Sequence, residues 1–451
     1  MASESRDIFS GRSSVKEFLF SKSGGKSVEK KADLTLQSTR DALRSRFPNA
    51  IWNPPFVDNV LSRLSGADRF GTIFVKIDPF DGARNPKQET REGLVLDLAG
   101  ILEGLCDKND AGWGPIDADR FGCYFVGKTD HECLQTGQAI QEELSKRRKE
   151  TVSIGVAQYP TLNFSRSQVF ENAVKALDHA AFFGSNSRIV FDAVSLNISG
   201  DARYQEGDVE GAIREFQAAR KLDPKNINVH NSLGVCFAIS GDHQRARECF
   251  EQARWIDPGE GMAVYNLGLL SLMAGDREAA LILFLESDRI KEGVYEVVFQ
   301  IGRLYFELGT PENGKRYLKN AVRIRPASAP AYRCLGECSI QMNLIDEALS
   351  AFQKAVKLNP NDAASLSALG CLFQKVGENP EIALSFCQQS VQISPEEGLF
   401  RYRLGELYFR CDKFDEAKEE LKAADRLGHD AKDLLKKIEE KLEGKAHDNG
   451  F

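Results

Sequence analysis

The chain has 451 residues, enough for two or three domains with separate cores, and 42% of its residues are hydrophobic and 28% charged, as is typical of a globular protein. Its formal net charge of -7 at pH 7 excludes a general electrostatic attraction to nucleic acid or to an anionic membrane. Because no apolar run is long enough to span a membrane and the N-terminal sequence is polar and interrupted by charges, we expect a cytoplasmic protein without membrane insertion.

Residues 1–34 are rich in Ser, Lys and Gly and have no sustained period, which predicts a disordered tail. From there to residue 195, helical and strand patterns alternate. In chain order, we expect "LQSTRDALRSRF" (helix), "TIFVKID" (strand), "QETREGLVLDLAGILEGLCDK" (helix), "FGCYFV" (strand), "DHECLQTGQAIQEELSKRR" (helix), "TVSIGVAQYP" (strand), "SQVFENAVKALDHAAFF" (helix) and "SRIVFD" (strand). The alternation predicts a domain over residues 35–195 with one mixed sheet and helices packed on it.

Four segments of this domain, "FVKIDPFD", "DADRF", "VSIGVA" and "ALDHAAFFGSNSRIVF", together resemble the GGDEF domain, the diguanylate cyclase fold of bacteria. "FVKIDPFD" stands where that family has a strand ending in DxDxFK, and "DADRF" stands in place of GGDEF itself. "VSIGVA" and "ALDHAAFFGSNSRIVF" follow two further family patterns in the family's order. The resemblance covers about residues 66–195 and implies a nucleotide-cyclase-like fold and a bacterial protein.

The positions that the resemblance places in a cyclase site are mostly altered. Such a site gathers carboxylates on Mg²⁺ and uses glycines to bring the backbone close to phosphate groups. Here the first metal-binding position is Lys76, the two turn glycines are Asp117 and Ala118, and the fourth residue of the turn motif is Arg120. We therefore expect a degenerate domain that is not an enzyme, with no catalytic residue, no metal and no cofactor.

The remaining positions of the family's site are partly retained and partly altered. Asp78, Asp119 and Phe121 are retained. The positions that contact guanine in the family are Arg84 and Glu92, the phosphate-contacting lysine is Ala181, and "KNDA" stands in place of the product-inhibition motif. We predict that Asp119 forms an ion pair with Lys76 where the metal would sit. Two interpretations of Lys76, Arg84 and Arg120 stay open: an altered nucleotide pocket, or solvated surface charges.

The C-terminal part of the chain is a repeat array over residues 196–429. Glycines recur every 34 residues, and a large apolar residue follows sixteen positions after each of the first five. The glycines are Gly200, Gly234, Gly268, Gly302, Gly336 and Gly370, then Gly405, and the apolar residues are Phe216, Phe250, Phe284, Leu318 and Phe352. The pattern predicts two helices per repeat that approach closely at the small residues and enclose the large one.

This pattern resembles the tetratricopeptide repeat (TPR), and "NSLGVCFAISGDHQRARECFEQARWIDP" is a full copy of that motif. We expect seven repeats in an all-α solenoid, followed by a capping helix and tail over residues 430–451. The third repeat has Glu292 at the proline position, and the sixth carries one extra residue near "GENPEIA". The predicted fold class is therefore α+β: a mixed-sheet, GGDEF-like domain followed by the solenoid.

The TPR resemblance implies a concave groove lined by the first helix of each repeat. The positions that face this groove in the family are Met262, Tyr265, Leu269, Leu272, Phe299, Arg303, Phe306, Arg333, Glu337, Tyr402, Glu406 and Phe409. We expect Tyr265, Arg303 and Arg333 in the groove, whereas Phe299 and Phe306 are equally compatible with packing between repeats. Aromatic and Arg side chains commonly anchor protein partners, so an amphipathic helix or an apolar extended peptide is the expected ligand.

These expectations favour a non-catalytic scaffold or regulatory protein that binds partner proteins through the groove. The alternative is a sensor of GTP or cyclic di-GMP, or a residual cyclase, that relays its state through the array. A homodimer through the GGDEF-like domain is a further expectation, because two such domains face each other in the family's reaction. The ten cysteines include no CxxC pair and the six histidines form no cluster, which favours free thiols and no metal site.

Overall fold

The computed structural model describes residues 33–448, except 53–55, 80–87, 107–109 and 378–379. The predicted disordered tail therefore lies almost entirely outside the described residues. Contacts divide the chain into two compact units, Met1–Pro258 and Gly259–Phe451. This division falls inside the repeat array, because the first repeat packs against the preceding α/β domain.

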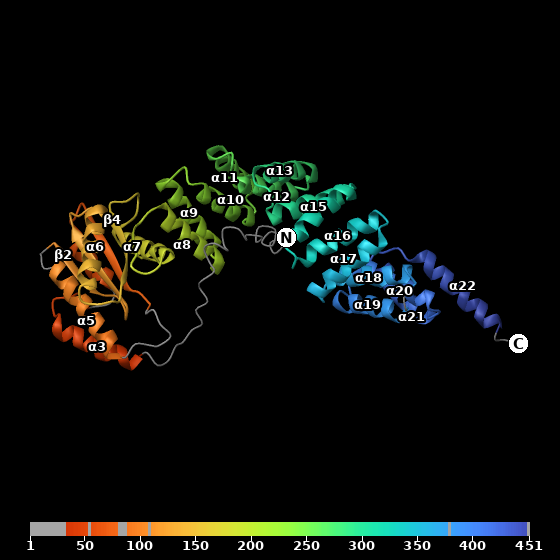
Figure 1. Ribbon diagram of the computed structural model, residues 1–451, viewed down its shortest axis with the longest axis horizontal. Helices are drawn as coiled ribbons and strands as arrows, with labels where there is room; N and C mark the ends of the chain where they lie inside the picture. The colour runs from red at the N-terminus through yellow and green to blue at the C-terminus, as the bar shows by residue number, and fades with distance from the viewer. Residues whose placement is uncertain (1–32, 53–55, 80–87, 107–109, 378–379, 449–451) are drawn as a thin grey trace. The chain divides into compact units, whose positions relative to one another are not determined.

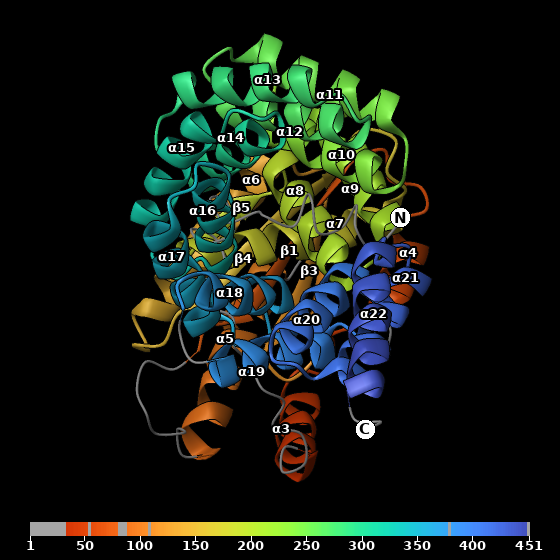
Figure 2. The ribbon, with the colours of Figure 1, turned by 90° about the vertical axis from the view of Figure 1, so that its right-hand side faces the viewer.

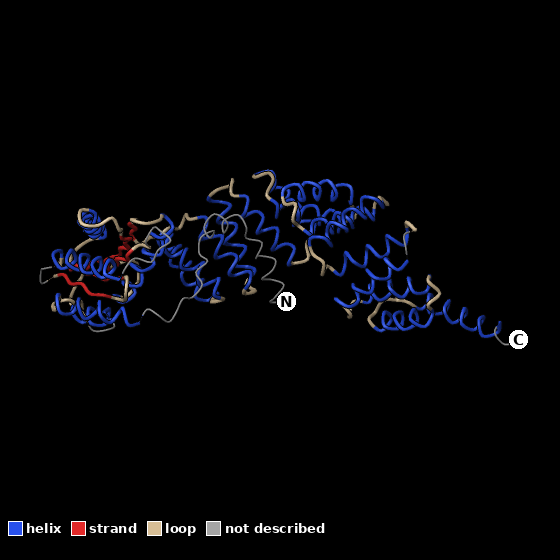
Figure 3. The backbone as a smooth tube through the Cα atoms, turned by 60° about the horizontal axis from the view of Figure 1, so that its bottom comes forward, coloured by secondary structure: helices blue, strands red, loops and turns tan. Residues whose placement is uncertain are grey.

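Strands occur only in the α/β domain, within residues 70–190 of the described chain, and the rest is helical (Figures 1 and 3). Its elements are α3 (Asp33–Arg46), α4 (Phe56–Arg63), β1 (Phe70–Ile77), α5 (Gln88–Leu105), β2 (Ala111–Pro115), β3 (Arg120–Val126), α6 (Asp130–Ser145), β4 (Val152–Tyr159), α7 (Arg166–Ala180), the 3-10 turn η1 (Ala181–Phe183) and β5 (Arg188–Val190). The predicted helices and strands are confirmed, and α4 and β2 are elements that the sequence patterns did not predict.

The five strands form one mixed sheet in the order β2-β3-β1-β4-β5. Neighbouring strands are antiparallel except β4 and β5, which are parallel. Strand β1 lies in the centre, and seven of its eight residues are buried, with Lys76 the exposed one. A central strand covered on both faces needs such a nearly continuous apolar run, which explains "FGTIFV".

Helix α7 packs closely on β4 because Gly155 has no side chain. A Cβ atom at Gly155 would lie 2.1 Å from the carbonyl oxygen of Ala173 in α7. The start of α7 is fixed by a capping box, in which Ser165 and Gln168 bond to each other's backbone N–H groups. The glycine of "VSIGVA" thus sets the distance at which α7, with all its side chains, lies from the sheet.

The repeats form seven helix pairs among the described residues, as predicted. They are α8 (Ala193–Glu206) with α9 (Val209–Leu222), α10 (Ile227–Ile239) with α11 (His243–Ile256), α12 (Gly261–Met273) with α13 (Arg277–Ile290), α14 (Tyr295–Glu307) with α15 (Pro311–Ile324), α16 (Ala329–Gln341) with α17 (Ile345–Leu358), α18 (Ala363–Lys375) with α19 (Pro380–Ile393), and α20 (Gly398–Arg410) with α21 (Phe414–Arg426). Helix α22 (Lys432–Asp448) covers the end and packs on α21, as expected of a cap.

The helices of residues 259–451 lie in two layers. Figure 2 shows the second helices α13, α15, α17 and α19 outside the first helices α12, α14, α16 and α18. Within a repeat, the ring of the large residue lies under the glycine: Phe284 would be 2.5 Å from a Cβ at Gly268, and Phe352 2.6 Å from one at Gly336. Both rings are almost fully buried, so the glycine and the ring are one packing unit that recurs with the period.

Candidate functional site

The turn between β2 and β3 occupies the place that the resemblance gives to the GGDEF motif, and Asp117 shapes it. The Asp117 carboxylate accepts hydrogen bonds from the backbone N–H groups of Asp119 (3.2 Å) and Arg120 (3.0 Å) and from Arg120 Nε (2.6 Å). Burial raises the pKa of Asp117, but the bonds from Arg120 and Asp119 outweigh it, so the pKa is lowered overall. Asp117 is therefore committed to holding the turn.

The predicted ion pair between Lys76 and Asp119 is wrong, although the two residues are neighbours. The backbone N–H of Ile77 donates to the Asp119 carbonyl (2.9 Å), and Lys76 lies opposite Arg120 in the sheet. Among the described residues, however, the ion pair at this turn joins Arg120 and Asp117 (2.5 Å). The backbone N–H groups of the turn already point at Asp117, so Arg120 joins the same carboxylate.

Asp78, the retained carboxylate directly after β1, is buried and accepts hydrogen bonds at both carboxylate oxygens. One oxygen accepts from Thr151 Oγ1 (2.6 Å) and from the backbone N–H of Asn186 (2.7 Å), and the other accepts from Ser153 Oγ (2.6 Å). These bonds tie the end of β1 to the start of β4 and to the loop before β5. A metal ion at Asp78 would have to displace these donors.

The other positions implied by the resemblance do not converge on one site. Phe121 is buried in the core, Ala181 is exposed in η1, and Glu92 is half-buried on α5. Arg84 lies outside the described residues. Within the part of the chain that the structure describes, no group of three or more His, Cys, Asp or Glu side chains could hold a metal ion.

Asp178 of α7, which was not among the predicted site residues, is an electrostatic neighbour of Lys76 and Arg120 at the turn. Desolvation raises the pKa of Asp178, and the positive charges of Lys76 and Arg120 oppose that rise. Desolvation and the neighbouring Asp117 likewise raise the pKa of Asp119. The turn therefore gathers two cations and three carboxylates, so both positive charges already have negatively charged neighbours within the protein.

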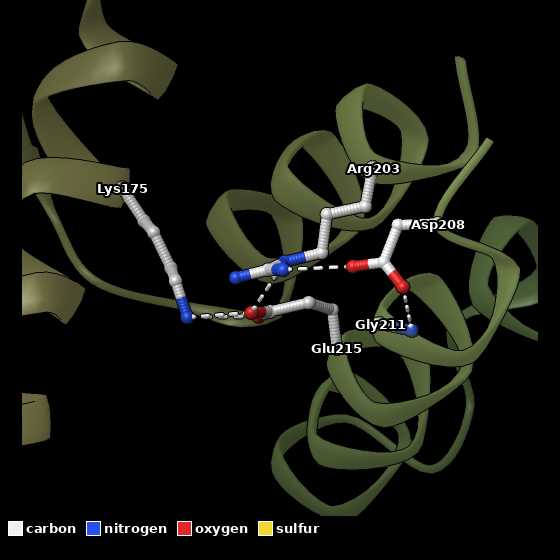
Figure 4. Close-up of polar contacts among 5 residues, drawn as sticks. All are labelled: Lys175, Arg203, Asp208, Gly211 and Glu215. Carbon is white, nitrogen blue, oxygen red and sulfur yellow. Dashed lines mark hydrogen bonds and ion pairs between the residues drawn. The ribbon is translucent and has the colours of Figure 1, made fainter. Parts of the chain in front are cut away.

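The same helix fixes the first repeat. Lys175 of α7 donates to both carboxylate oxygens of Glu215 in α9 (2.9 and 2.8 Å), as Figure 4 shows. Arg203 of α8 lies between Glu215 (3.4 Å) and Asp208 (3.0 Å), and the other Asp208 oxygen accepts from the backbone N–H of Gly211. The Lys175 and Glu215 side chains are only 15% and 11% exposed.

The segment that joins the α/β domain to the first repeat is short. Strand β5 ends at Val190 and α8 begins at Ala193, with the Asp192 side chain capping α8. His179 of α7 lies 3.1 Å from Ser195 Oγ and 3.4 Å from Asp192. The first repeat helix thus follows almost directly from the last strand, and polar contacts from one helix, α7, hold the junction.

On the first-helix face of residues 259–451, two of the predicted groove residues are buried. Tyr265 is 5% exposed and Leu269 is 1% exposed. The Tyr265 ring packs on Phe284 with centroids 5.3 Å apart, and burial raises the pKa of its hydroxyl. The expectation that Tyr265 anchors a ligand in an open groove is therefore corrected: its ring covers the large residue of its own repeat.

The two predicted arginines remain accessible and face carboxylates. Arg303 Nε lies 3.5 Å from Glu307, and Arg333 Nη1 lies 3.1 Å from Asp362, with the two side chains 36% and 37% exposed. Glu337 is 4.0 Å from Arg333, and desolvation raises the pKa of Glu337. Asp362 was not predicted, although its place before α18 as an N-cap is a recognisable signal.

The remaining groove positions are intermediate. Phe299 and Phe306 are half-buried and pack against the core of repeats four and five, so they contribute to both packing and surface. Tyr402 is half-buried against His429, with ring centroids 4.7 Å apart, and Met262 is half-buried. Leu272, Glu406 and Phe409 are also half-buried. The accessible face is therefore an arginine–carboxylate surface with aromatic edges.

Comparisons with known families bear on the repeats. A family model described as "TPR repeat" matches residues 200–241, and two described as "tetratricopeptide repeat" match residues 240–293, and 305–370 with 378–439. Together with the seven helix pairs, these matches confirm that the chain contains tetratricopeptide repeats. None of the matching family models is a GGDEF domain, so that identity stays a prediction.

Several solved structures are similar to part of the chain. YrrB, described as a TPR protein with an unusual peptide-binding site, is 20% identical, with 41% of this chain and 95% of YrrB covered and a TM-score of 0.37. PilF of Pseudomonas aeruginosa is 19% identical, with 46% and 95% covered and a TM-score of 0.43. MamA is 25% identical, with 36% and 96% covered and a TM-score of 0.33. No curated protein matches the chain.

Among the described helices, none combines the length and the apolar character that crossing a bilayer requires.

Proposed function

We propose that this chain is a non-catalytic scaffold that binds partner proteins through the first-helix face of its TPR array, and that its N-terminal domain is a degenerate GGDEF-like domain that positions the array. The observation that carries the proposal is the accessible row of Arg303 and Arg333 on that face. Each has a carboxylate within 3.5 Å, and Arg303 shares its helix with the half-buried Phe299 and Phe306; arginine and aromatic side chains together are common in protein interfaces.

The absence of catalysis is part of the proposal. It rests on Lys76 at the position where the resemblance needs a metal-binding carboxylate, and on Asp78, whose oxygens are occupied by Thr151, Ser153 and Asn186. A cation at a metal position repels Mg²⁺. The turn charges pair among themselves, which further reduces the attraction for a nucleotide phosphate.

Affinity capture with the full chain from a native lysate tests the scaffold function. We expect the double variant Arg303→Ala/Arg333→Ala to recover partner proteins about tenfold less well than the wild type. Arg323→Ala is the matched control, because Arg323 is exposed on the second helix α15 and, among the described residues, its hydrogen bonds go to Asn320 of the same helix. Equal recovery by all three proteins would argue against the first-helix face as the binding surface.

The alternative is a sensor of GTP or cyclic di-GMP, supported by the cations Lys76 and Arg120 at one turn. Calorimetry of the full chain with GTP and Mg²⁺, and separately with cyclic di-GMP, tests it: saturable heat that Lys76→Ala abolishes would favour sensing over a purely structural domain. Light scattering tests the expected homodimer in the same samples. Both measurements are independent of partner capture.

A further inference from the structure

The sixth repeat departs from the array at its core position. In the other repeats that position holds a large residue: Phe216, Phe250, Phe284, Leu318, Phe352 and, in the seventh, Leu421. In the sixth repeat, after one extra residue, it holds Cys387. A thiol therefore lies between the two helices of this repeat at the point where the others have a ring or a leucine.

The structure shows that Cys387 takes the place of the missing ring. Its side chain is fully buried, and its Sγ lies 2.4 Å from where a Cβ atom at Gly370 would be, just as the Phe352 ring lies under Gly336. The Cys387 thiol faces the carbonyl oxygen of Ser367 at 3.8 Å. Cys387 of α19 is thus in contact with one turn of α18.

A second cysteine belongs to that same turn. Cys371 directly follows Gly370 and, unlike the fully buried Cys387, is half-buried and reachable from solvent. An interaction between the two thiol groups lowers the pKa of Cys371 and raises that of Cys387. Because the Cys387 sulfur lies against Gly370, the residue before Cys371, the two cysteines occupy facing turns of α18 and α19, one half-buried and one fully buried.

Arg403 of the next repeat lies beside this pair. Its Nη1 donates to Ser367 Oγ (3.1 Å), one helical turn before Cys371. The interaction with Cys387 is the main cause that lowers the pKa of Cys371, and burial opposes it. The positive charge of Arg403 also lowers this pKa. A thiolate is the reactive form of cysteine and is favoured near a guanidinium group, so Cys371 is the nucleophile of the pair.

We propose that Cys371 and Cys387 form a reversible redox pair that hydrogen peroxide converts into a disulfide between α18 and α19. The Cys371 thiolate attacks one peroxide oxygen, the O–O bond breaks, and Cys371 becomes a sulfenic acid while the released hydroxide takes a proton to become water. The Cys387 thiol then attacks the Cys371 sulfur, the S–O bond breaks, and the departing hydroxide takes the thiol proton as a second water. The two sulfurs together lose two electrons, and the peroxide gains two.

The other described cysteines provide a contrast. Cys334 and Cys338 are one turn apart in the same helix, are both buried, and have pKa values that burial raises to about 12. Cys106 and Cys123 are also buried. Cys411 is half-buried like Cys371, which makes it the matched control for accessibility. Accessibility and an adjacent thiol thus occur together at Cys371.

Peptide mapping of the full chain tests the proposal. Trypsin places Cys371 alone in the peptide 358–375 and Cys387 alone in 376–401, so a disulfide joins two separable peptides. After peroxide and alkylation, we expect loss of two thiols per chain, this linked pair, and its disappearance with dithiothreitol. Before oxidation, iodoacetamide should label Cys371 about tenfold or more faster than Cys334.

Single variants keep the test decisive. In Cys387→Ser, Cys371 should accumulate as a sulfenic acid that dimedone traps, because the resolving thiol is gone, whereas Cys411→Ser should form the disulfide as the wild type does. Melting curves of the reduced proteins check that the variants fold. Wild-type Cys371 that oxidises to sulfenic or sulfonic acid without the linked peptides, or that labels no faster than Cys334, would overturn the proposal.

Discussion

The junction between α7 and the first repeat offers a direct test of how the α/β domain holds the array. Replacing Lys175 by Met removes both hydrogen bonds to Glu215 and leaves that buried carboxylate with Arg203 at 3.4 Å. Removing one member of a buried ion pair costs about 3–5 kcal/mol, because the other charge stays desolvated. The remaining Arg203 contact and the residual exposure of Glu215 reduce this to about 2 kcal/mol of local stability.

Hydrogen exchange of the full chain, followed by mass spectrometry, measures this loss where it occurs. A change of about 2 kcal/mol corresponds to about thirtyfold faster exchange of amides that open with the junction. We expect this acceleration in peptides from α7 and α9. The double variant Lys175→Met/Glu215→Leu should recover most of the protection, because two apolar residues replace a buried charge pair at little cost.

The matched control is Lys221→Met, since Lys221 is exposed on the last turn of α9. It should leave exchange in α7 and α9 unchanged. Two results would refute the reasoning: no acceleration in α9 with Lys175→Met, or no recovery in the double variant. The first would mean that the ion pair does not hold the junction, and the second that the loss does not come from an unpaired Glu215 carboxylate.

Further predictions concern the fold of each unit. Asp78→Ala leaves three donors without their acceptor and should destabilise the α/β domain by about 3 kcal/mol in urea unfolding, with no dependence on added Mg²⁺. Gly155→Ala should cost about 3 kcal/mol or more in the same assay, because its Cβ would overlap the backbone of α7. Phe352→Ala should cost about 4 kcal/mol by removing a fully buried ring, with faster exchange confined to residues 259–451. The lowered pKa of Asp117 contributes stability above its unfolded pKa of about 4, which is lost as pH falls through the folded value; Asp117→Asn should therefore flatten the acid side of the Tm profile.

Contacts between residues close in sequence could be predicted. The 34-residue period predicted seven helix pairs, because in every repeat but the sixth the glycine and its large apolar partner are only sixteen residues apart and meet. The strands β1, β3 and β4 were likewise visible as apolar runs, since a central sheet position demands burial on both faces.

The burial of individual side chains and the partners of charged groups could be determined only from the tertiary structure. Tyr265 occupies a groove position by its place in the repeat, but its ring turns onto Phe284, and only the packing of neighbouring helices decides which edge stays open. Asp78 looked like a remnant of a metal site. Its donors, however, lie 73 to 108 residues away in the chain, so its role as a tie between β1, β4 and the β5 loop has no local signal.

The turn after β2 shows the same division. The sequence by itself determined that the turn directly precedes the apolar strand β3, and that its glycines are replaced by Asp117 and Ala118. Only the tertiary structure decided that Arg120 pairs with Asp117 rather than leaving Asp119 to pair with Lys76. The reason is geometric: the backbone N–H groups of a tight turn converge on the side chain at its start, and that carboxylate attracts the nearest cation.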